Sequence, residues 1–252
     1  MKKTFGIFLL LLIFISVTAC KMKKSDVVSS PINKSIEAAE TGVVVDATEK
    51  NNQIIYAKPG DIILIVLRGQ LNEFNQWSLR EPVTEGFVNL SDHKIITEND
   101  LRLKVGEYIS EWKFKVLKED VFQIVFRFEN PLKPAVPLNT YRVAVISFSD
   151  MKKVPYIIVN EPKNNAEVLT KFIIAGYVQA QEKTVYYKIS DTENNLLSEG
   201  AIKLGEKSSY FEKTIEYRNP RKRDINLEVF QKTTDTDPIL YTVQIPLTFK
   251  QK

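Results

Sequence analysis

The chain has 252 residues, of which 44% are apolar and 26% are charged, a balance that indicates a soluble globular protein and excludes wholesale disorder. Its 35 basic and 31 acidic residues leave a net charge of +4, an excess too small to indicate nucleic-acid binding. One His and one Cys are too few for a His/Cys metal site or an internal disulfide, and leave little scope for His-dependent catalysis. We therefore expect no cofactor and no metal. The length predicts two domains, at roughly 100–150 residues each.

The first twenty residues, MKKTFGIFLLLLIFISVTAC, have the pattern of a bacterial export signal. Two Lys precede an apolar run that is shorter than the roughly 20 residues a membrane-spanning helix needs. The end of the run, Val17-Thr18-Ala19-Cys20, resembles the lipobox of bacterial lipoproteins, in which a peptidase cleaves before the Cys and its thiol carries a diacylglycerol. This resemblance implies a signal peptide at residues 1–19 and lipidation of Cys20. The alternative is a plain secretory signal that ends by chance in Cys.

Residues 20–42 are polar and rich in Ser, Lys and Glu, which predicts a flexible tether between the lipidated Cys20 and the folded part. A lipid on Cys20 would hold the protein on the outer side of a bacterial membrane, so we expect an extracytoplasmic, lipid-anchored protein. Lys21, Lys23 and Lys24 either contact anionic head groups or are simply solvated. The sequence does not specify which membrane carries the protein or its oligomeric state.

From Val43 onward, apolar residues alternate with a period of two or form β-branched runs, which predicts β-strands. The expected strands of the first domain are 43–47, 53–57, 62–67, 77–80, 87–90, 109–116, 121–128 and 141–148. In the segment 111–116, Trp112, Phe114 and Val116 share one face, as in a half-buried strand. The segment 62–67 is apolar on both faces, so we expect it to be a central strand.

A polar break at 149–153 separates a second β series, with strands expected at 156–159, 172–178, 184–190, 195–203, 209–217, 225–231 and 240–249. This number of strands in about a hundred residues is typical of an immunoglobulin-like sandwich. The predicted fold class is therefore all-β, with two immunoglobulin-like β-sandwich domains in series, 43–149 and 154–252. A Cys–Trp–Cys core is absent from the sequence, so the second core should be formed by Phe172, Ile174, Tyr187, Ile189, Phe211, Leu227 and Phe230.

The first domain contains a series of short motifs, in this order: Pro59-Gly60-Asp61, Trp77, Trp112-Lys113-Phe114, Ile124-Val125-Phe126 and Tyr141-Arg142-Val143-Ala144-Val145. With these motifs the domain resembles the chagasin-type inhibitors of cysteine proteases. The resemblance implies a sandwich whose three loops at one end fill a protease cleft. The loops themselves differ from the family pattern. The first lacks the Pro, Thr and Gly of the family, and the third reads Phe128-Glu129-Asn130 in place of Arg-Pro followed by an aromatic residue.

The second domain contains Ile158-Val159-Asn160-Glu161-Pro162, Ala175-Gly176, Lys188-Ile189-Ser190-Asp191, Leu197-Ser198-Glu199-Gly200, Ser209-Tyr210-Phe211-Glu212, Leu227-Glu228-Val229-Phe230 and Val243-Gln244-Ile245-Pro246-Leu247. It is similar to the immunoglobulin-like domain associated with bacterial spore germination and sporulation proteins. That resemblance implies an extracytoplasmic accessory module without catalytic residues.

Three features of the sequence are candidate sites of chemistry. His93 lies in a polar run that predicts a solvated loop. The run 191–195 has oxygens at alternate positions, as a calcium loop does, but Leu196 and Ile202 stand where Gly and a carboxylate are needed, so a hairpin turn is expected. The cationic segment 218–223 either binds an anionic polymer or a membrane surface, or is a solvated loop, and the loop is favoured.

The sequence thus predicts a non-catalytic, lipid-anchored envelope protein that binds or scaffolds another protein through loops at one end of its first sandwich. An unidentified envelope protein and the membrane are the expected partners, and nucleic acid is not. The predicted partner-binding residues are Leu71, Asn72, Glu73, Phe74, Asn75, Gly106, Glu107, Tyr108, Glu129, Asn130 and Pro131. For Phe74 and Tyr108, exposure as binding anchors and packing back onto the sandwich both stay open. The alternatives are an inhibitor of papain-like proteases with diverged loops, and an envelope enzyme with a carboxylate site.

Overall fold

The computed structural model describes residues 42–70, 75–80, 86–97, 103–130, 132, 136–179, 182–220, 222–232 and 238–250. These residues belong to one compact unit. Within them the chain forms β-strands and one short 3-10 helix, η1 (Met151–Lys153), which lies between two β-sandwiches. The predicted all-β fold with two sandwiches in series is confirmed. None of the described helical residues forms a helix long and apolar enough to cross a membrane.

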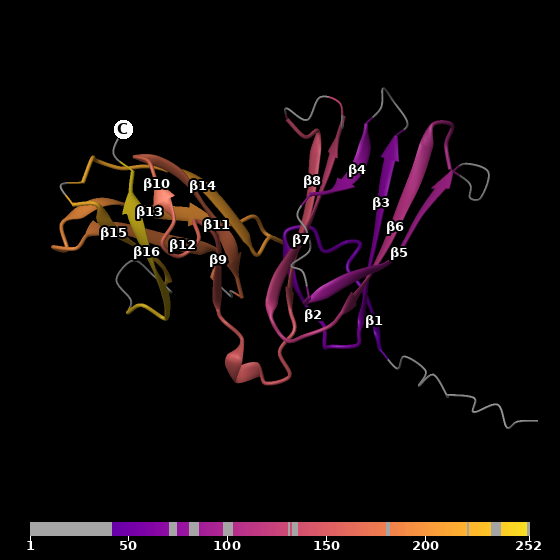
Figure 1. The fold of residues 1–252 in the computed structure, drawn as a ribbon, viewed down its shortest axis with the longest axis horizontal. Helices are drawn as coiled ribbons and strands as arrows, with labels where there is room; N and C mark the ends of the chain where they lie inside the picture. The colour runs from indigo at the N-terminus through magenta and orange to yellow at the C-terminus, as the bar shows by residue number, and fades with distance from the viewer. Residues whose placement is uncertain are drawn as a thin grey trace, which may run out of the picture. The chain divides into compact units, whose positions relative to one another are not determined.

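The first sandwich consists of two four-stranded sheets, ordered β1-β3-β6-β5 and β2-β8-β7-β4. Figure 1 shows β3, β5 and β6 as long neighbouring strands of one sheet. The strands are β1 (Val44–Asp46), β2 (Gln53–Tyr56), β3 (Ile62–Gln70), β4 (Gln76–Leu79), β5 (Val88–Thr97), β6 (Glu107–Val116), β7 (Val121–Glu129) and β8 (Asn139–Ile146).

The alternation of the sequence decides which side chains of the first sandwich form its core. Trp112, Phe114 and Val116 of β6 are buried, and Ile124 and Phe126 of β7 face them from the other sheet. β3 lies between β1 and β6, as its apolar composition predicts. It is preceded by a turn in which Gly60 has φ +98 and the Asp61 N–H donates to the Lys58 carbonyl at 2.9 Å. Such a turn requires Gly at this position.

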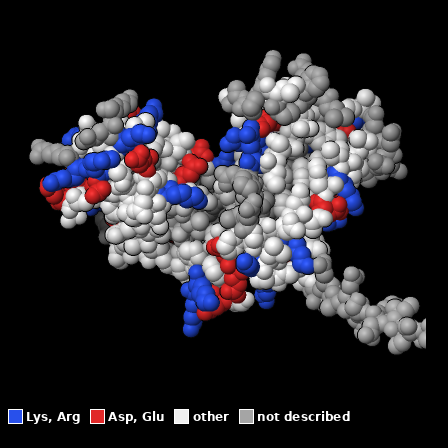
Figure 2. All heavy atoms as spheres, viewed as in Figure 1, with Lys and Arg blue, Asp and Glu red and all other residues white. Residues whose placement is uncertain are grey.

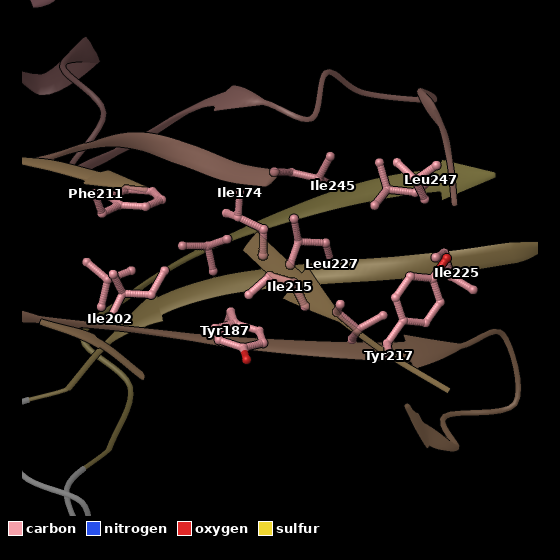
Figure 3. Close-up of a cluster of buried hydrophobic side chains, with 14 of the residues drawn as sticks. Ile174, Tyr187, Ile202, Phe211, Ile215, Tyr217, Ile225, Leu227, Ile245 and Leu247 are labelled. Carbon is pink, nitrogen blue, oxygen red and sulfur yellow. The ribbon is translucent and has the colours of Figure 1, made fainter. Parts of the chain in front are cut away.

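The second sandwich pairs a five-stranded sheet, β10-β16-β15-β12-β13, with a three-stranded sheet, β14-β11-β9. Its strands are β9 (Ile157–Glu161), β10 (Glu167–Val168), β11 (Lys171–Val178), β12 (Thr184–Asp191), β13 (Leu196–Lys203), β14 (Tyr210–Glu216), β15 (Asp224–Gln231) and β16 (Tyr241–Phe249). Figure 3 shows how aliphatic and aromatic side chains of the two sheets fill the space between them. The short strand β10, which pairs with β16 in parallel, was not predicted.

Two of the predicted core residues of the second sandwich differ from the others. Ile174, Tyr187, Ile189, Phe211 and Leu227 are buried in the core, as predicted. Phe172 is only partly buried and packs against that core. Phe230 lies on the outer face of its sheet, where it stacks on Tyr186 at a ring distance of 5.6 Å. The prediction for Phe230 was wrong because the core-facing positions of β15 are odd-numbered, from Ile225 to Val229.

β8 and β11 depart from simple alternation toward their ends. Ala144 and Ile146 in β8, and Ala175 and Tyr177 in β11, are at most 5% exposed, yet they belong to neither core cluster. The last residues of both strands are therefore buried on both faces. Burial on both faces is expected where one sheet packs against another surface.

Polar contacts join the two sandwiches beside these strands. The Arg142 guanidinium is 2.9 Å from the Glu212 carboxylate and lies 4.2 Å from the centre of the Tyr210 ring. The Asn52 carbonyl accepts from the backbone N–H groups of Ser209 and Tyr210, at 2.8 and 3.1 Å. An ion pair, a cation–π contact and backbone hydrogen bonds thus connect the first sandwich to the second.

Candidate functional site: the loop end of the first sandwich

The residues predicted from sequence as a partner-binding surface fall on three segments, only parts of which are described. Asn75, Gly106, Glu107, Tyr108, Glu129 and Asn130 lie within the described residues. Leu71, Asn72, Glu73, Phe74 and Pro131 lie outside them, and so does the predicted lipidation site, Cys20.

The structure brings the flanks of all three segments together. β3 ends where β6 begins, with Gln70 paired to Glu107, and β7 ends where β8 begins, with Phe128 paired to Asn139. β4 starts opposite the end of β7, with Gln76 paired to Glu129. These strand ends lie at one end of the sandwich (Figure 1). A hollow of about 290 Å³ opens between the two sheets there, lined by Arg68, Gln70, Trp77, Glu107, Phe128 and Asn139.

Trp77 is the residue that holds this hollow in shape. Its indole Nε1–H donates to the Arg68 carbonyl at 2.8 Å, and its backbone N–H donates to the Tyr108 hydroxyl at 3.0 Å. Its ring lies 5.4 Å from that of Phe128, tilted by 45°. Because Trp77 belongs to one sheet and Arg68 and Tyr108 to the other, these bonds fix the spacing of the sheets at their open end. Sequence reasoning noted Trp77 only as part of the scaffold and did not single out Phe128 as a site residue.

Tyr108 closes the sandwich beneath the hollow and is only 3% exposed. Its ring lies across Gly69, the residue directly opposite on β3, where an added Cβ would meet the ring at 2.4 Å. Burial raises the pKa of the Tyr108 hydroxyl. Of the two alternatives open for Tyr108, packing back onto the sandwich is the one observed, so Tyr108 is not an exposed anchor. The missing side chain at position 69 is what makes room for it.

Glu129 is also buried, contrary to its prediction as a contact residue on the surface. Its side chain is 4% exposed and forms an ion pair with Arg80, with the nitrogen and oxygen 2.5 Å apart. The Ser78 hydroxyl donates to the same carboxylate at 3.3 Å. A buried carboxylate needs such partners, since desolvation without them would be costly. Glu129 therefore ties the end of β7 to the segment after β4.

Exposed apolar side chains surround the strand ends. Val105 precedes β6 and is 93% exposed, and in the segment before β8 Leu132, Val136 and Leu138 are 79%, 80% and 67% exposed. Scattered single apolar residues on a surface need no explanation, whereas these four lie at one end of the same sandwich. Val105 and Leu138 each flank a strand whose first residue, Glu107 or Asn139, lines the hollow.

Two of the three candidate sites of chemistry, at His93 and Asp191, make structural contacts among the described residues. His93 lies in β5 rather than in a loop, and its ring stacks on Trp112 with the centroids 4.9 Å apart. The prediction of a loop failed because β5 continues past an irregularity between Leu90 and Asp92. The Asp191 carboxylate accepts hydrogen bonds from the backbone N–H groups of Glu193 and Asn195, which closes the predicted hairpin turn.

The described residues of the cationic segment, 218–220 and 222–223, form a loop between β14 and β15, as favoured from the sequence, and Lys222 pairs with Glu193 at 3.2 Å. Figure 2 shows basic and acidic side chains next to one another on the visible face, so no field of a single sign forms there. Among the described residues, no group of His, Cys, Asp and Glu side chains could hold a metal ion.

A comparison with protein families matches most of the second sandwich. Residues 156–236 match the family described as the immunoglobulin-like domain of bacterial spore germination. In sequence, no curated protein matches the chain.

Among solved structures, the chain is similar to a cysteine protease inhibitor from Entamoeba histolytica, with 20% identity, 42% of this chain and 95% of that one covered, and a TM-score of 0.37. It is similar to amebosin, with 16% identity, 42% and 98% covered, and a TM-score of 0.34. Fibronectin(III)-like modules of Clostridium thermocellum CbhA have 9% identity, with 85% and 93% covered and a TM-score of 0.27. At these scores the likenesses bear on neither activity nor partner.

Proposed function

We propose that this chain is a non-catalytic envelope protein that binds another protein through the loop end of its first sandwich. One observation carries the proposal: the flanks of three separate segments converge on a hollow lined by Trp77 and Phe128, with exposed apolar residues around it. Aromatic and apolar side chains held on a rigid scaffold are typical of the anchors that dominate protein interfaces.

The proposal includes an anchor. The sequence Val17-Thr18-Ala19-Cys20 supports lipidation of Cys20, which would place both sandwiches outside the cytoplasm. Metabolic labelling with a palmitate analogue should label the full-length protein and should not label a Cys20→Ser variant, which should be released from the membrane fraction. Equal labelling of the two proteins would overturn the anchor.

Binding at the loop end can be tested by photo-crosslinking in intact cells. A photoreactive amino acid replaces Val136 or Val105 at the loop end, and Leu117 at the opposite end serves as the matched exposed control. We expect a discrete adduct from Val136 and Val105 but not from Leu117, and we expect it to disappear when soluble residues 21–252 are added to permeabilised cells. Equal adducts from all three positions, or none from the loop end, would overturn the proposal.

A further inference from the structure

The hollow at the loop end has the chemistry of a receptor for one side chain. Two half-buried aromatic rings, Trp77 and Phe128, supply its apolar lining, and polar groups surround them. Among these polar groups are two amides, Gln70 and Asn139, on strands of opposite sheets. Apolar pockets with a few convergent polar groups are the usual form of a binding site in proteins.

The size of the hollow limits what can enter it. Its volume of about 290 Å³ is at the lower end of the roughly 300–1,000 Å³ that hold drug-sized ligands. One large side chain fits such a volume, and a folded element of a partner does not. A partner that uses this hollow would enter it with a single residue and rest its main chain on the rim.

The polar groups of the rim suit a peptide main chain. A side-chain amide both donates and accepts, as each peptide unit does. Gln70 offers such an amide from one sheet, and Asn139 offers its amide nitrogen from the other, because its Oδ1 already accepts from the Thr140 N–H at 2.8 Å. Arg68 and Glu107 add one charge of each sign, so the rim has no net preference for an anionic or a cationic partner. This balance disfavours an isolated ion as the ligand.

Hydrogen bonds hold the lining in place before any partner arrives. Trp77 donates through its indole N–H to the Arg68 carbonyl and through its backbone N–H to the Tyr108 hydroxyl, and the Tyr108 ring packs on Gly69. A preorganised pocket loses little conformational entropy on binding, so even a shallow contact can contribute affinity.

From these observations we propose that the hollow between Trp77 and Phe128 receives one large apolar side chain, aromatic or leucine, from an extended segment of a protein partner. This inference rests on the proposed function, because it names what the loop end recognises. In this proposal Trp77 and Phe128 bind the inserted side chain, and Gln70 and Asn139 contact the main chain of the partner's segment.

Nuclear magnetic resonance of the two indole N–H groups tests the inference without the partner. The Trp77 signal is assigned with a Trp77→Phe variant, and Trp112, which is only 3% exposed, serves as the internal control. Titration of soluble residues 21–252 with N-acetylphenylalanine amide should shift the Trp77 signal saturably and leave the Trp112 signal in place. N-acetylalanine amide should produce no saturable shift. Equal responses to the two amides, or none at Trp77, would overturn the inference.

A filling variant separates the inference from the proposed function. Asn139→Trp places a large ring at the hollow, and Asn89→Trp places the same ring at an exposed position of β5. With the photoreactive residue at Val105, Asn139→Trp should reduce the adduct at least tenfold, and Asn89→Trp should leave it unchanged. An undiminished adduct with Asn139→Trp refutes the hollow as the receptor while partner binding at the loop end stands. Loss of saturable amide binding in Asn139→Trp, with retention in Asn89→Trp, confirms the position of the site even before a partner is known.

Discussion

The ring of Tyr108 lies across Gly69 on the neighbouring strand, and its hydroxyl accepts the backbone N–H of Trp77 from the opposite sheet. One side chain therefore uses a space that only Gly leaves open and links the two sheets at their open end. The second sandwich contains a similar pair, in which Tyr187 lies opposite Gly200 and an added Cβ would meet its ring at 3.0 Å. Glycine thus has a packing role in both sandwiches.

Gly69→Ala should destabilise the protein by about 1–3 kcal/mol, the usual cost of forcing an extra methyl group into a packed site. The new Cβ would meet the Tyr108 ring at 2.4 Å, and that ring is held by its bond to Trp77. Urea unfolding measures the change. The control is Gly205→Ala, where the nearest atom would be 3.6 Å away and stability should hardly change. Equal stability of the two variants would show that the Tyr108 ring can yield.

Tyr108→Phe should cost about 1 kcal/mol of unfolding free energy, because the Trp77 N–H loses its acceptor. The matched control is Tyr177→Phe. The Tyr177 hydroxyl is buried with no hydrogen-bond partner among the described residues, so its removal should be neutral or stabilising. Both variants keep the ring, and thermal unfolding compares them directly. A larger loss in Tyr177→Phe than in Tyr108→Phe would contradict the assignment of the Trp77 bond.

The contact between Arg142 and Glu212 should make stability depend on pH. A hydrogen bond from Tyr210 and the nearby Arg142 guanidinium lower the pKa of Glu212. A carboxyl group whose pKa is lowered by folding stabilises the protein above its unfolded value of about 4.3 and loses that contribution as the pH falls through the folded value. The free energy of unfolding, measured from pH 7 down to pH 3, should therefore decline more steeply in the wild type than in Glu212→Gln.

The control for that pH series is Glu199→Gln, an exposed glutamate on β13, which should keep the wild-type slope. Because the Glu212 side chain is 49% exposed, the effect should weaken as salt is raised. If Glu212→Gln and the wild type had parallel pH profiles, the ion pair between the sandwiches would contribute nothing measurable.

Soluble residues 21–252 should not inhibit a papain-like protease at about 10 μM, a concentration at which a binding energy near −7 kcal/mol would be detected. The first loop lacks the Pro, Thr and Gly expected of an inhibitory wedge, and a wedge must hold its shape on entering a cleft. Stoichiometric inhibition with a submicromolar constant would instead make the loop end an inhibitor site. Val136→Asp and Leu117→Asp would then distinguish that end from the opposite one.

Most of the strands and their core faces were determined by the sequence itself, with the second half of β5, the short strand β10 and the face of Phe230 as exceptions. Alternation in β6 and the two-sided apolar run in β3 are local patterns, and a strand places successive side chains on opposite faces wherever it forms. For the same reason the turns at Gly60 and Asp191 were predictable, since each depends on residues within a few positions of one another.

Only the tertiary structure decided which residues of the loop end face inward. Tyr108 is buried because Gly69 lies opposite it on another strand, and Glu129 is buried because Arg80 reaches it from a segment far away in the chain. Trp77 and Phe128 form a hollow because two sheets are held apart at a set spacing. Such pairings depend on strand register between segments distant in sequence, and no local pattern of residues encodes that register by itself.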